Sequence, residues 1–235
     1  ASLLDKLIKQ ESYLNLYALE IDKKPLEYSL RSKSFLKLWD KKVKNIFESL
    51  YRKDHFEDKF FNCRIIWGDA RKKINNIPSA NKFDLIYLDG FSPQKCPQLW
   101  TIEFLSKLTQ KLNPQGYLIT YSSSAAVRKT LRNLGLEIFT IKPSLNSRTF
   151  WSQGTVAIAK FDKDKINPNL NFEKLSTMEE EHLLTKASIP YRDVNLNSSK
   201  DNIIKERLDE QLFSNLLSTK TWREKWGMTK SALRS

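Results

Sequence analysis

The chain contains few cysteines and histidines and has no long apolar run. Two cysteines and two histidines occur among its 235 residues, too few to predict a disulfide framework or a zinc cluster. The cysteine count favours a reducing cytoplasm as the location. A transmembrane helix needs about 20 mostly apolar residues, so no membrane span is predicted. The N-terminus shows no basic segment followed by an apolar stretch and a small-residue cleavage site, and therefore no signal peptide is predicted.

Glycine is also scarce. The chain has six glycines, and none of them precedes Gly68. Loops that bring the backbone close to a bound nucleotide use glycine because a side chain would block the approach. The sequence therefore predicts no glycine-rich cofactor loop before Gly68. The chain also contains no GxGxxG pattern.

Positive charge, by contrast, is abundant. Lys and Arg number 40 against 27 Asp and Glu, which gives a formal net charge of +13. An excess of this size favours a polyanionic partner, because neutralising phosphates releases counterions. The alternative is a Lys/Asn/Ile-rich composition that makes many proteins of one organism basic. Charge alone does not separate RNA from DNA.

Apolar periodicity predicts strands that alternate with helices. The predicted strands are residues 13–21, 64–67, 85–88, 117–121, 136–141 and 155–160, and the predicted helices are residues 1–10, 30–51, 71–77, 101–112, 124–134, 178–186 and 200–217. This alternation predicts an α/β fold with right-handed crossovers and a mostly parallel sheet. The last two strands follow each other without a helix and are expected to pair antiparallel. Residues 1–162 are predicted to form one domain, and residues 163–235 a linker and a helical, basic extension.

The most informative stretch is residues 83–121. Residues 85–88 are a continuous apolar run, as expected of a strand that is buried on both faces. Asp89 follows where this strand should end, and a Gly-Phe-Ser-Pro turn comes after it. In open α/β sheets, ligands bind outside the carboxyl ends of the strands. Asp89 is therefore placed where chemistry would occur, and capping of the next helix is the alternative.

Two segments of this region are LDGFSPQKCPQLWT and GYLITYSSSAAVRKTLRNLG. They contain an Asp-Gly-Phe-Ser-Pro loop, a Pro-x-x-Trp-Thr segment, a Thr-Tyr strand end and a Val-Arg helix. In this order and spacing they resemble the methyltransferase domain of the MnmC family of tRNA-modifying proteins. The resemblance extends from about residue 17 to about residue 159 and resumes at residues 189–193. It implies a Rossmann-like class I methyltransferase fold that uses S-adenosylmethionine and yields S-adenosylhomocysteine. The chain resembles the stand-alone members of the family and has no room for the flavin-dependent oxidase domain of the two-domain members, so FAD is not expected. The few Cys and His residues predict no metal.

The resemblance assigns cofactor contacts to the ends of two predicted strands. Glu20 matches the acid that binds the ribose of S-adenosylmethionine, and a solvent-facing acid at a strand end is the alternative. Asp69 matches the residue that holds the adenine amino group, with the backbone of Ala70 at a ring nitrogen. Alternatively, Asp69 caps the helix that follows it.

The resemblance also assigns the chemistry to residues 89–93, called the Asp89 loop below. Asp89 is expected to contact the cofactor and either to accept the proton of the reacting amine or to orient that amine. Phe91 and Pro93 are expected to line the pocket and to keep water out.

Further residues near strand ends and helix starts are candidates for contact with substrate or RNA. Aromatic rings stack on flipped bases, and Arg or Lys pairs with phosphate. The candidates are Lys95, Trp100, Tyr121, Arg128 and Arg148. Each has a structural or solvated alternative, which for Trp100 is a place in the core. Residues 191–193 and 222–226 are expected either to contact tRNA or to pin the C-terminal segment to the domain.

The chain departs from the family pattern at its beginning. The family starts with a strand and a glycine-rich loop, whereas residues 1–10 resemble the helix that follows that loop. In this fold the missing strand would lie at the centre of the sheet, between the strands that end at Glu20 and Asp89. We therefore expect weak or absent cofactor binding by this form. We also expect a gap in the sheet that is closed by rearrangement, a dimer or strand exchange, because unpaired buried backbone groups are costly.

The leading functional prediction, implied by the resemblance, is methylation of an aminomethyl group on a wobble-position thiouridine of tRNA. The substrate would be 5-aminomethyl-2-thiouridine and the product 5-methylaminomethyl-2-thiouridine. Two alternatives stay open: the same fold could methylate another amine, or the chain could be a non-catalytic RNA-binding protein built on a degenerate methyltransferase fold. The sequence gives neither the tRNA species nor the oligomeric state.

Overall fold

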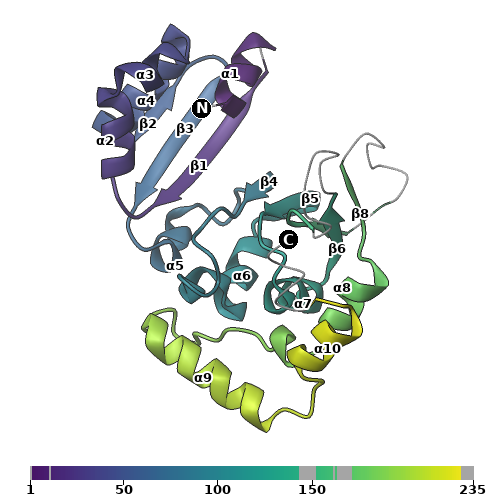
Figure 1. Ribbon diagram of the computed structural model, residues 1–235. Coiled ribbons are helices and arrows are strands. Elements are labelled where there is room, and N and C mark those ends of the chain that lie inside the picture. The colour runs from purple at the N-terminus through teal and green to yellow at the C-terminus, as the bar shows by residue number, and fades with distance from the viewer. Residues whose placement is uncertain (1, 11, 143–151, 161, 163–170, 229–235) are drawn as a thin grey trace. The chain divides into compact units, whose positions relative to one another are not determined.

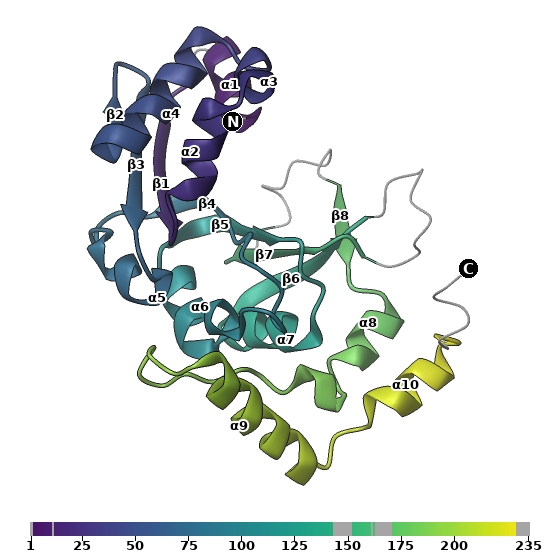
Figure 2. The same ribbon diagram turned by 60° about the vertical axis from the view of Figure 1, so that its left-hand side comes forward.

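The computed structural model describes residues 2–10, 12–142, 152–160, 162 and 171–228 (Figures 1 and 2). The chain divides into two compact units, Ala1–Pro78 and Ser79–Ser235. The predicted boundary between residues 162 and 163 falls at the edge of the described residues and stays a prediction. No helix in these ranges is long and apolar enough to cross a membrane.

The first unit contains a three-stranded sheet, five helices and a 3-10 helix within its described residues. Its strands are β1 (Leu14–Glu20), β2 (His55–Glu57) and β3 (Phe61–Trp67). Their order is β1-β3-β2, in which β1 pairs parallel and β2 antiparallel with β3. The helices are α1 (Ser2–Lys9), α2 (Lys24–Arg31), α3 (Lys33–Lys37), α4 (Lys41–Lys53) and α5 (Ala70–Lys73), followed by the 3-10 helix η1 (Ile74–Asn76).

The core of the first unit lies between α4 and alternate residues of the strands. Figures 1 and 2 show α2, α3 and α4 gathered on one side of the strands. The buried residues of this cluster are Leu4, Val43, Ile46, Leu50, Phe61, Cys63 and Ile65. Because strand side chains alternate between faces, Asn62 and Arg64, which lie between the cluster residues of β3, point to the other face of the sheet. Burial raises the pKa of the Cys63 thiol to about 11.

The predicted helix over residues 30–51 is wrong as a single element. The structure has α2, α3 and α4 in this region. The Ser32 hydroxyl accepts a hydrogen bond from the backbone N–H of Phe35, and the Asp40 carboxylate accepts one from the backbone N–H of Val43. Each side chain therefore starts a new helix as its N-cap, which a single apolar period does not reveal.

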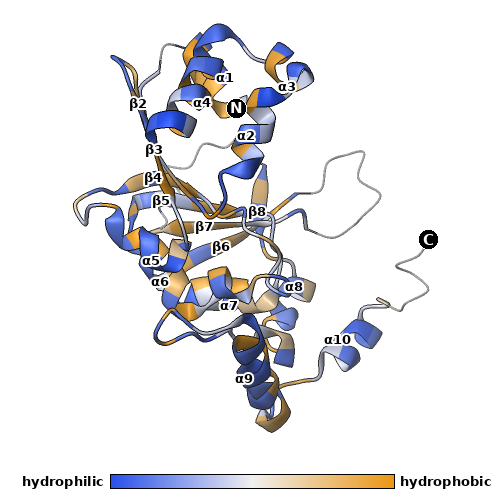
Figure 3. Cartoon of the chain, turned by 90° about the vertical axis from the view of Figure 1, so that its left-hand side faces the viewer, coloured by the Kyte–Doolittle hydropathy of each residue, from blue (hydrophilic) through white to orange (hydrophobic). Residues whose placement is uncertain are grey.

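The second unit is built on a five-stranded sheet of order β4-β5-β7-β6-β8. The strands are β4 (Phe83–Tyr87), β5 (Leu112–Thr120), β6 (Leu136–Ile141), β7 (Thr155–Ala159) and β8 (Phe172–Lys174). The helices are η2 (Pro97–Trp100), α6 (Ile102–Thr109), α7 (Ala125–Asn133), α8 (Thr177–His182), η4 (Lys186–Ser188), α9 (Lys200–Phe213) and α10 (Thr219–Lys225). Figure 3 shows hydrophobic residues concentrated in β5 and β7, whereas α9 is largely hydrophilic.

The α/β fold is confirmed, but the sheets are mixed rather than mostly parallel. Strands β4 and β5 pair parallel, whereas β5–β7, β6–β7 and β6–β8 are antiparallel. The antiparallel pairing of the last two predicted strands, β6 and β7, is therefore confirmed. Among the described strands, β1 pairs only with β3 and β4 only with β5.

The apolar run of β4 is not buried on both faces, as the sequence predicted. Leu85 is 37% exposed and Tyr87 is 60% exposed. In this sheet β4 is an end strand with one neighbour, β5, so apolar composition alone does not bury both of its faces. The next residue, Leu88, is buried, and its N–H donates to the carbonyl of Ile119.

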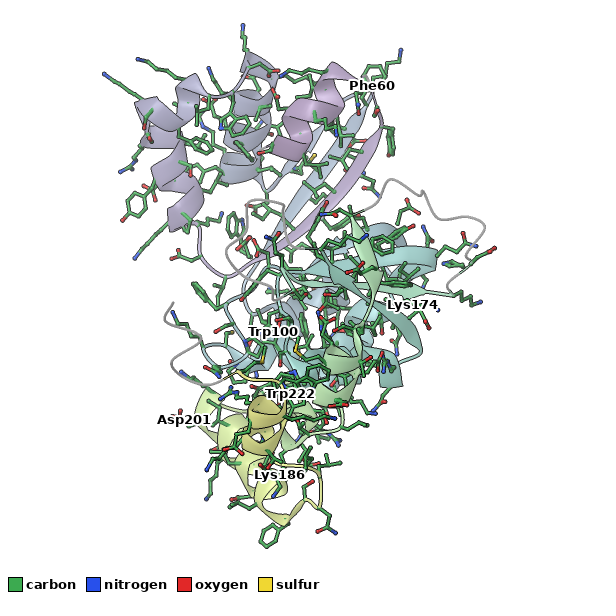
Figure 4. All side chains as sticks on the ribbon, turned by 45° about the vertical axis from the view of Figure 1, so that its right-hand side comes forward. Phe60, Trp100, Lys174, Lys186, Asp201 and Trp222 are labelled. Carbon is green, nitrogen blue, oxygen red and sulfur yellow. The ribbon has the colours of Figure 1, made fainter. Side chains whose placement is uncertain are left out.

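Aromatic residues hold the C-terminal segment against the rest of the second unit. Tyr191 is buried under the guanidinium of Arg207, which lies 4.4 Å from its ring centroid. Trp222 stacks on His182 with ring centroids 4.1 Å apart, and its indole N–H donates to the carbonyl of Met178. Figure 4 labels Trp222, which belongs to α10. Of the two interpretations of these motifs, the structure therefore favours pinning of the segment.

Candidate functional site

Asp89 lies immediately beyond the carboxyl end of β4. Because β4 and β5 are parallel, with Tyr87 opposite Ile119, their ends meet at one edge of the sheet, where Asp89 and Tyr121 are neighbours in register. The Asp89 side chain is exposed. Parallel strand ends of this kind are where α/β proteins bind their ligands.

Two aromatic side chains hold the backbone of the loop that follows Asp89. The hydroxyl of Tyr121 donates to the carbonyl of Gly90 at 2.8 Å. The indole N–H of Trp100 donates to the carbonyl of Phe91, also at 2.8 Å. The two rings meet edge to face, with centroids 6.2 Å apart and planes at 87°. The loop is thus tied to η2 and to the end of β5 at two successive carbonyls.

This arrangement changes the predicted role of Trp100. The side chain is fully buried at 0% exposure, and its one polar atom is taken by the loop. The expected substrate contact does not fit this burial, so the core alternative holds. Tyr121 is 46% exposed and contacts the loop with its hydroxyl. Burial and the nearby Asp89 charge raise the pKa of Tyr121, so the donated hydrogen bond persists above the pH at which an ordinary tyrosine ionises.

The remaining residues of the loop differ in exposure. Phe91 is 76% exposed, whereas Pro93 is buried. Only Pro93 is therefore enclosed as expected of a pocket wall in this structure, and Phe91 projects toward solvent. Lys95 is exposed and makes no ion pair with any residue that the structure describes. Its ammonium group is thus available to a phosphate.

In the first unit, Glu20 ends β1 directly opposite Trp67 of β3. Its side chain is exposed, and its carbonyl accepts the N–H of Gly68 at 2.8 Å. Gly68 has φ +121, and a Cβ there would lie 2.8 Å from the side chain of Lys73. A glycine therefore makes the turn from β3 into α5 and places Asp69 at the same edge as Glu20.

Asp69 is the N-cap of α5. Its Oδ1 accepts the backbone N–H of Arg71 at 3.0 Å, and its carboxylate also pairs with the Arg71 guanidinium, at 2.7 Å from Oδ2. Burial acts to raise the pKa of Asp69, but the hydrogen bonds from Arg71 outweigh it and hold the pKa below its usual value. The capping alternative is therefore realised, and the predicted adenine contact of Asp69 and Ala70 stays a prediction.

A charged cluster that the sequence analysis missed lies beside Glu20. The Lys23 ammonium sits 5.0 Å from the centroid of the Trp67 ring and 3.2 Å from Asp54 Oδ1. The indole N–H of Trp67 donates to the same oxygen at 2.6 Å. The one signal in the sequence was the position of Trp67 directly before Gly68-Asp69. A planar ring is thus fixed at the edge where the resemblance places the ribose acid.

The prediction that Arg128 contacts RNA is wrong for this structure. Arg128 is 1% exposed, and its guanidinium pairs with Glu179 at 2.8 Å. Its remaining N–H groups donate to oxygens of Thr140, Ser152, Gly154 and Thr155. All of these partners are internal, so the side chain joins α7 to α8 and to the sheet. Arg148 lies outside the described residues.

A family model described as S-adenosyl-L-methionine-dependent methyltransferase matches residues 33–152. The chain belongs to this methyltransferase family. The expected resemblance to MnmC-type domains is confirmed as well, because several relatives carry that name. The MnmC protein of Campylobacter hominis, named for tRNA 5-methylaminomethyl-2-thiouridine biosynthesis, is 29% identical over 126 residues, which is 51% of this chain and 18% of that protein.

Other relatives extend the comparison. An uncharacterized protein of Methanocaldococcus jannaschii is 31% identical over 153 residues, which is 65% of this chain and 39% of that protein. The MnmC protein of Paraburkholderia phymatum is 32% identical over 83 residues, 35% of this chain and 12% of that protein. The chain therefore matches well under half the length of these relatives.

The crystal structure of MnmC2 from Aquifex aeolicus shares the fold of this methyltransferase. The match has a TM-score of 0.64 at 24% identity and covers 89% of this chain and 71% of the other. At this identity the likeness shows a Rossmann-like class I methyltransferase fold and nothing finer.

The strand-end residues of the first unit fit the nucleoside part of S-adenosylmethionine. The exposed carboxylate of Glu20 is an acceptor suited to two ribose hydroxyls. A carboxylate has about four lone-pair sites, so Asp69 retains acceptor capacity beyond its bonds to Arg71. Ala70, the first residue of α5, presents its backbone N–H where the helix has no partner for it.

Proposed function

We propose that this chain is an S-adenosylmethionine-dependent N-methyltransferase that acts on tRNA. The proposed reaction converts 5-aminomethyl-2-thiouridine to 5-methylaminomethyl-2-thiouridine at the wobble position. The observation that carries the proposal is the Asp89 loop, in which an exposed carboxylate at a strand end is followed by two carbonyls anchored by Tyr121 and Trp100. The names of the MnmC relatives and the net charge of +13 support RNA as the substrate.

The chemistry assigned to Asp89 follows from the protonation of the substrate. S-adenosylmethionine, when bound, supplies an electrophilic methyl group. An alkyl amine is largely protonated near neutral pH, and its nitrogen must lose a proton before it has a lone pair to donate. Asp89 accepts that proton, or the hydrogen bond that orients the neutral amine. A fixed loop backbone places this carboxylate with little loss of entropy when the substrate binds.

The other residues of the loop have supporting roles. Pro93 is buried and limits the conformations of the loop. Phe91, which is exposed, offers a ring on which the thiouracil can stack. Lys95, which is exposed, is assigned to a phosphate of the same tRNA. Glu20, Asp69 and Ala70 are assigned to the cofactor.

The decisive variant is Asp89→Asn. In a form of the protein that binds S-adenosylhomocysteine, we expect the rate of methyl transfer to aminomethyl-thiouridine tRNA to fall about 10²- to 10⁴-fold, the usual worth of an acid–base residue. Transfer of a labelled methyl group at saturating cofactor and tRNA measures this. The affinity for S-adenosylhomocysteine should change far less than the rate.

The matched control is Asp209→Asn, because Asp209 is exposed on α9, in a different element from Asp89. This variant makes the same change of charge and should turn over like the unaltered protein. Unchanged turnover of Asp89→Asn would remove Asp89 from the mechanism. Methylation of a small amine but not of tRNA would favour the alternative of another amine substrate.

A further inference from the structure

The face of the β1-β3-β2 sheet opposite α4 has its own set of polar side chains. Leu16 of β1, Cys63 of β3 and Phe56 of β2 belong to the cluster on the α4 side. Alternation along each strand therefore turns the neighbours of these residues to the opposite face. This face belongs to the first unit alone.

Three of these side chains form a row across the sheet. Tyr17 of β1 is directly opposite Arg64 of β3, and His55 of β2 is directly opposite Arg64 on its other side. Cross-strand partners on one face have Cβ atoms about 4.5–5.5 Å apart. All three line a cavity of about 320 Å³, together with Ile66, Asn76 and Pro78. Every residue that lines this cavity lies within Ala1–Pro78.

Positive charge in this cavity is not neutralised. The Arg64 side chain is exposed and makes no hydrogen bond or ion pair with any residue in the described ranges. The carboxylate that lines the cavity, Asp54, already accepts from Trp67 and Lys23. Glu57 of β2 is opposite Asn62 rather than Arg64. A guanidinium group that has no carboxylate partner favours the binding of an anion.

The neighbours of Arg64 suit an anion that carries a ring. His55 Nδ1 lies 2.9 Å from the carbonyl oxygen of Lys53. Because a carbonyl only accepts, Nδ1 is the donor in this hydrogen bond, and Nε2 is the ring nitrogen that this bond does not use. Tyr17 supplies an aromatic face, and Asn76 supplies both a donor and an acceptor. The cavity volume is at the low end of the range of about 300–1,000 Å³ for small-molecule sites.

We propose that this cavity binds a nucleoside phosphate unit. Arg64 pairs with the phosphate through two N–H groups, Tyr17 stacks on the base, and Asn76 contacts the base edge. The unit comes either from a nucleotide within an RNA strand or from a free nucleotide. The net charge of +13 favours the RNA strand. The site uses residues other than those assigned to methyl transfer and does not require that reaction.

The first test is calorimetric titration of uridine monophosphate into the full chain and two variants. Arg64→Gln should bind at least tenfold more weakly than the unaltered protein. Arg52→Gln, the matched control, removes the same charge from an exposed position on α4 and should bind normally. Equal affinity of Arg64→Gln and the unaltered protein, or the absence of saturable binding by the unaltered protein, would overturn the proposal.

A second variant separates the base from the phosphate. Tyr17→Leu keeps the charge of the cavity and an apolar side chain, so it should weaken binding of uridine monophosphate and leave binding of inorganic phosphate unchanged. If it weakens neither, the assigned stacking is wrong. Circular dichroism of each variant establishes that it is folded.

The source of the nucleotide is decided by tRNA affinity at several salt concentrations. Loss of one phosphate contact should reduce the salt slope of log K by about 0.7–0.9. If Arg64→Gln loses affinity for both tRNA and uridine monophosphate, the site holds RNA. If it loses only the latter, the site holds a free nucleotide. Neither assay needs S-adenosylmethionine, so failure of the methyltransferase proposal would leave these results interpretable.

Discussion

Trp100 and Tyr121 illustrate what a residue type does and does not reveal. Both were expected to contact substrate because aromatic rings stack on bases. A buried indole N–H needs an acceptor wherever it lies, and here the acceptor is the carbonyl of Phe91. The sequence could place both aromatic residues near the Asp89 loop. It could not show that they hold the backbone of that loop, because this depends on the packing of η2 against the end of β5.

Tyr121→Phe tests whether the loop anchor matters for catalysis. The change removes the hydroxyl that donates to the Gly90 carbonyl and keeps the ring against Trp100. A hydrogen bond of this kind contributes about 1 kcal/mol, so we expect kcat to fall about fivefold with little change in KM for tRNA. Steady-state methylation kinetics measure both constants.

Tyr28→Phe is the control for this variant, since Tyr28 is 65% exposed on α2. It should leave kcat unchanged. A Tyr121→Phe variant that raises KM and leaves kcat intact would show instead that the hydroxyl binds substrate. The positioning role would then be wrong.

At the scale of elements, the junction of α7 with α8 shows why Arg128 was misjudged. The sequence predicted the helix over residues 124–134, but most of α7 proved to be buried. The partner of Arg128 is Glu179, which is also the N3 residue of a capping box with Ser176. A pair that is 51 residues apart cannot be found from helical periodicity.

Arg128→Ala should therefore destabilise the protein strongly. Removing one partner of a buried ion pair leaves an uncompensated charge and costs about 3–5 kcal/mol. We expect the control Arg132→Ala, which breaks the neighbouring and more exposed pair with Glu180, to cost less than about 1 kcal/mol. Denaturant unfolding of both variants measures the difference. Equal small losses would mean that the buried pair is not what joins α8 to α7.

Acid should weaken the same junction. Burial acts to raise the pKa of Glu179, but hydrogen bonds from Ser176 and Arg128 outweigh it and hold the pKa below its usual value. A carboxylate with a lowered pKa in the folded state contributes stability above its unfolded pKa. That contribution is lost as the pH falls through the folded pKa.

For the whole molecule, the order of strands and helices was largely predictable, whereas the sheets were not. Periodicity is local, and it located all but the short strands β2 and β8. Pairing is non-local: the partition into two sheets and the single neighbours of β1 and β4 depend on contacts between distant segments. The central strand that the family pattern predicts stays a prediction.

Titration of S-adenosylhomocysteine tests that prediction on the whole molecule. We expect the 235-residue chain to bind weakly or not at all. A form extended at its N-terminus by a strand and a glycine-rich loop should bind, because such a loop lets the backbone approach the ligand. Calorimetry of the two forms measures this. Full affinity of the 235-residue chain would contradict the predicted weak binding, and no binding by either form would favour a non-catalytic RNA-binding protein.

The burial of Cys63 has a practical consequence. Its thiol is fully enclosed beneath α4, and its pKa is raised to about 11, so it resists alkylation near neutral pH. The chain has only one other cysteine, Cys96, which is partly accessible in the segment between the Asp89 loop and η2. A thiol-reactive fluorophore or spin label therefore marks one position next to the anchored loop without any prior mutation. The unaltered protein thus has a built-in attachment point for a spectroscopic reporter of that loop.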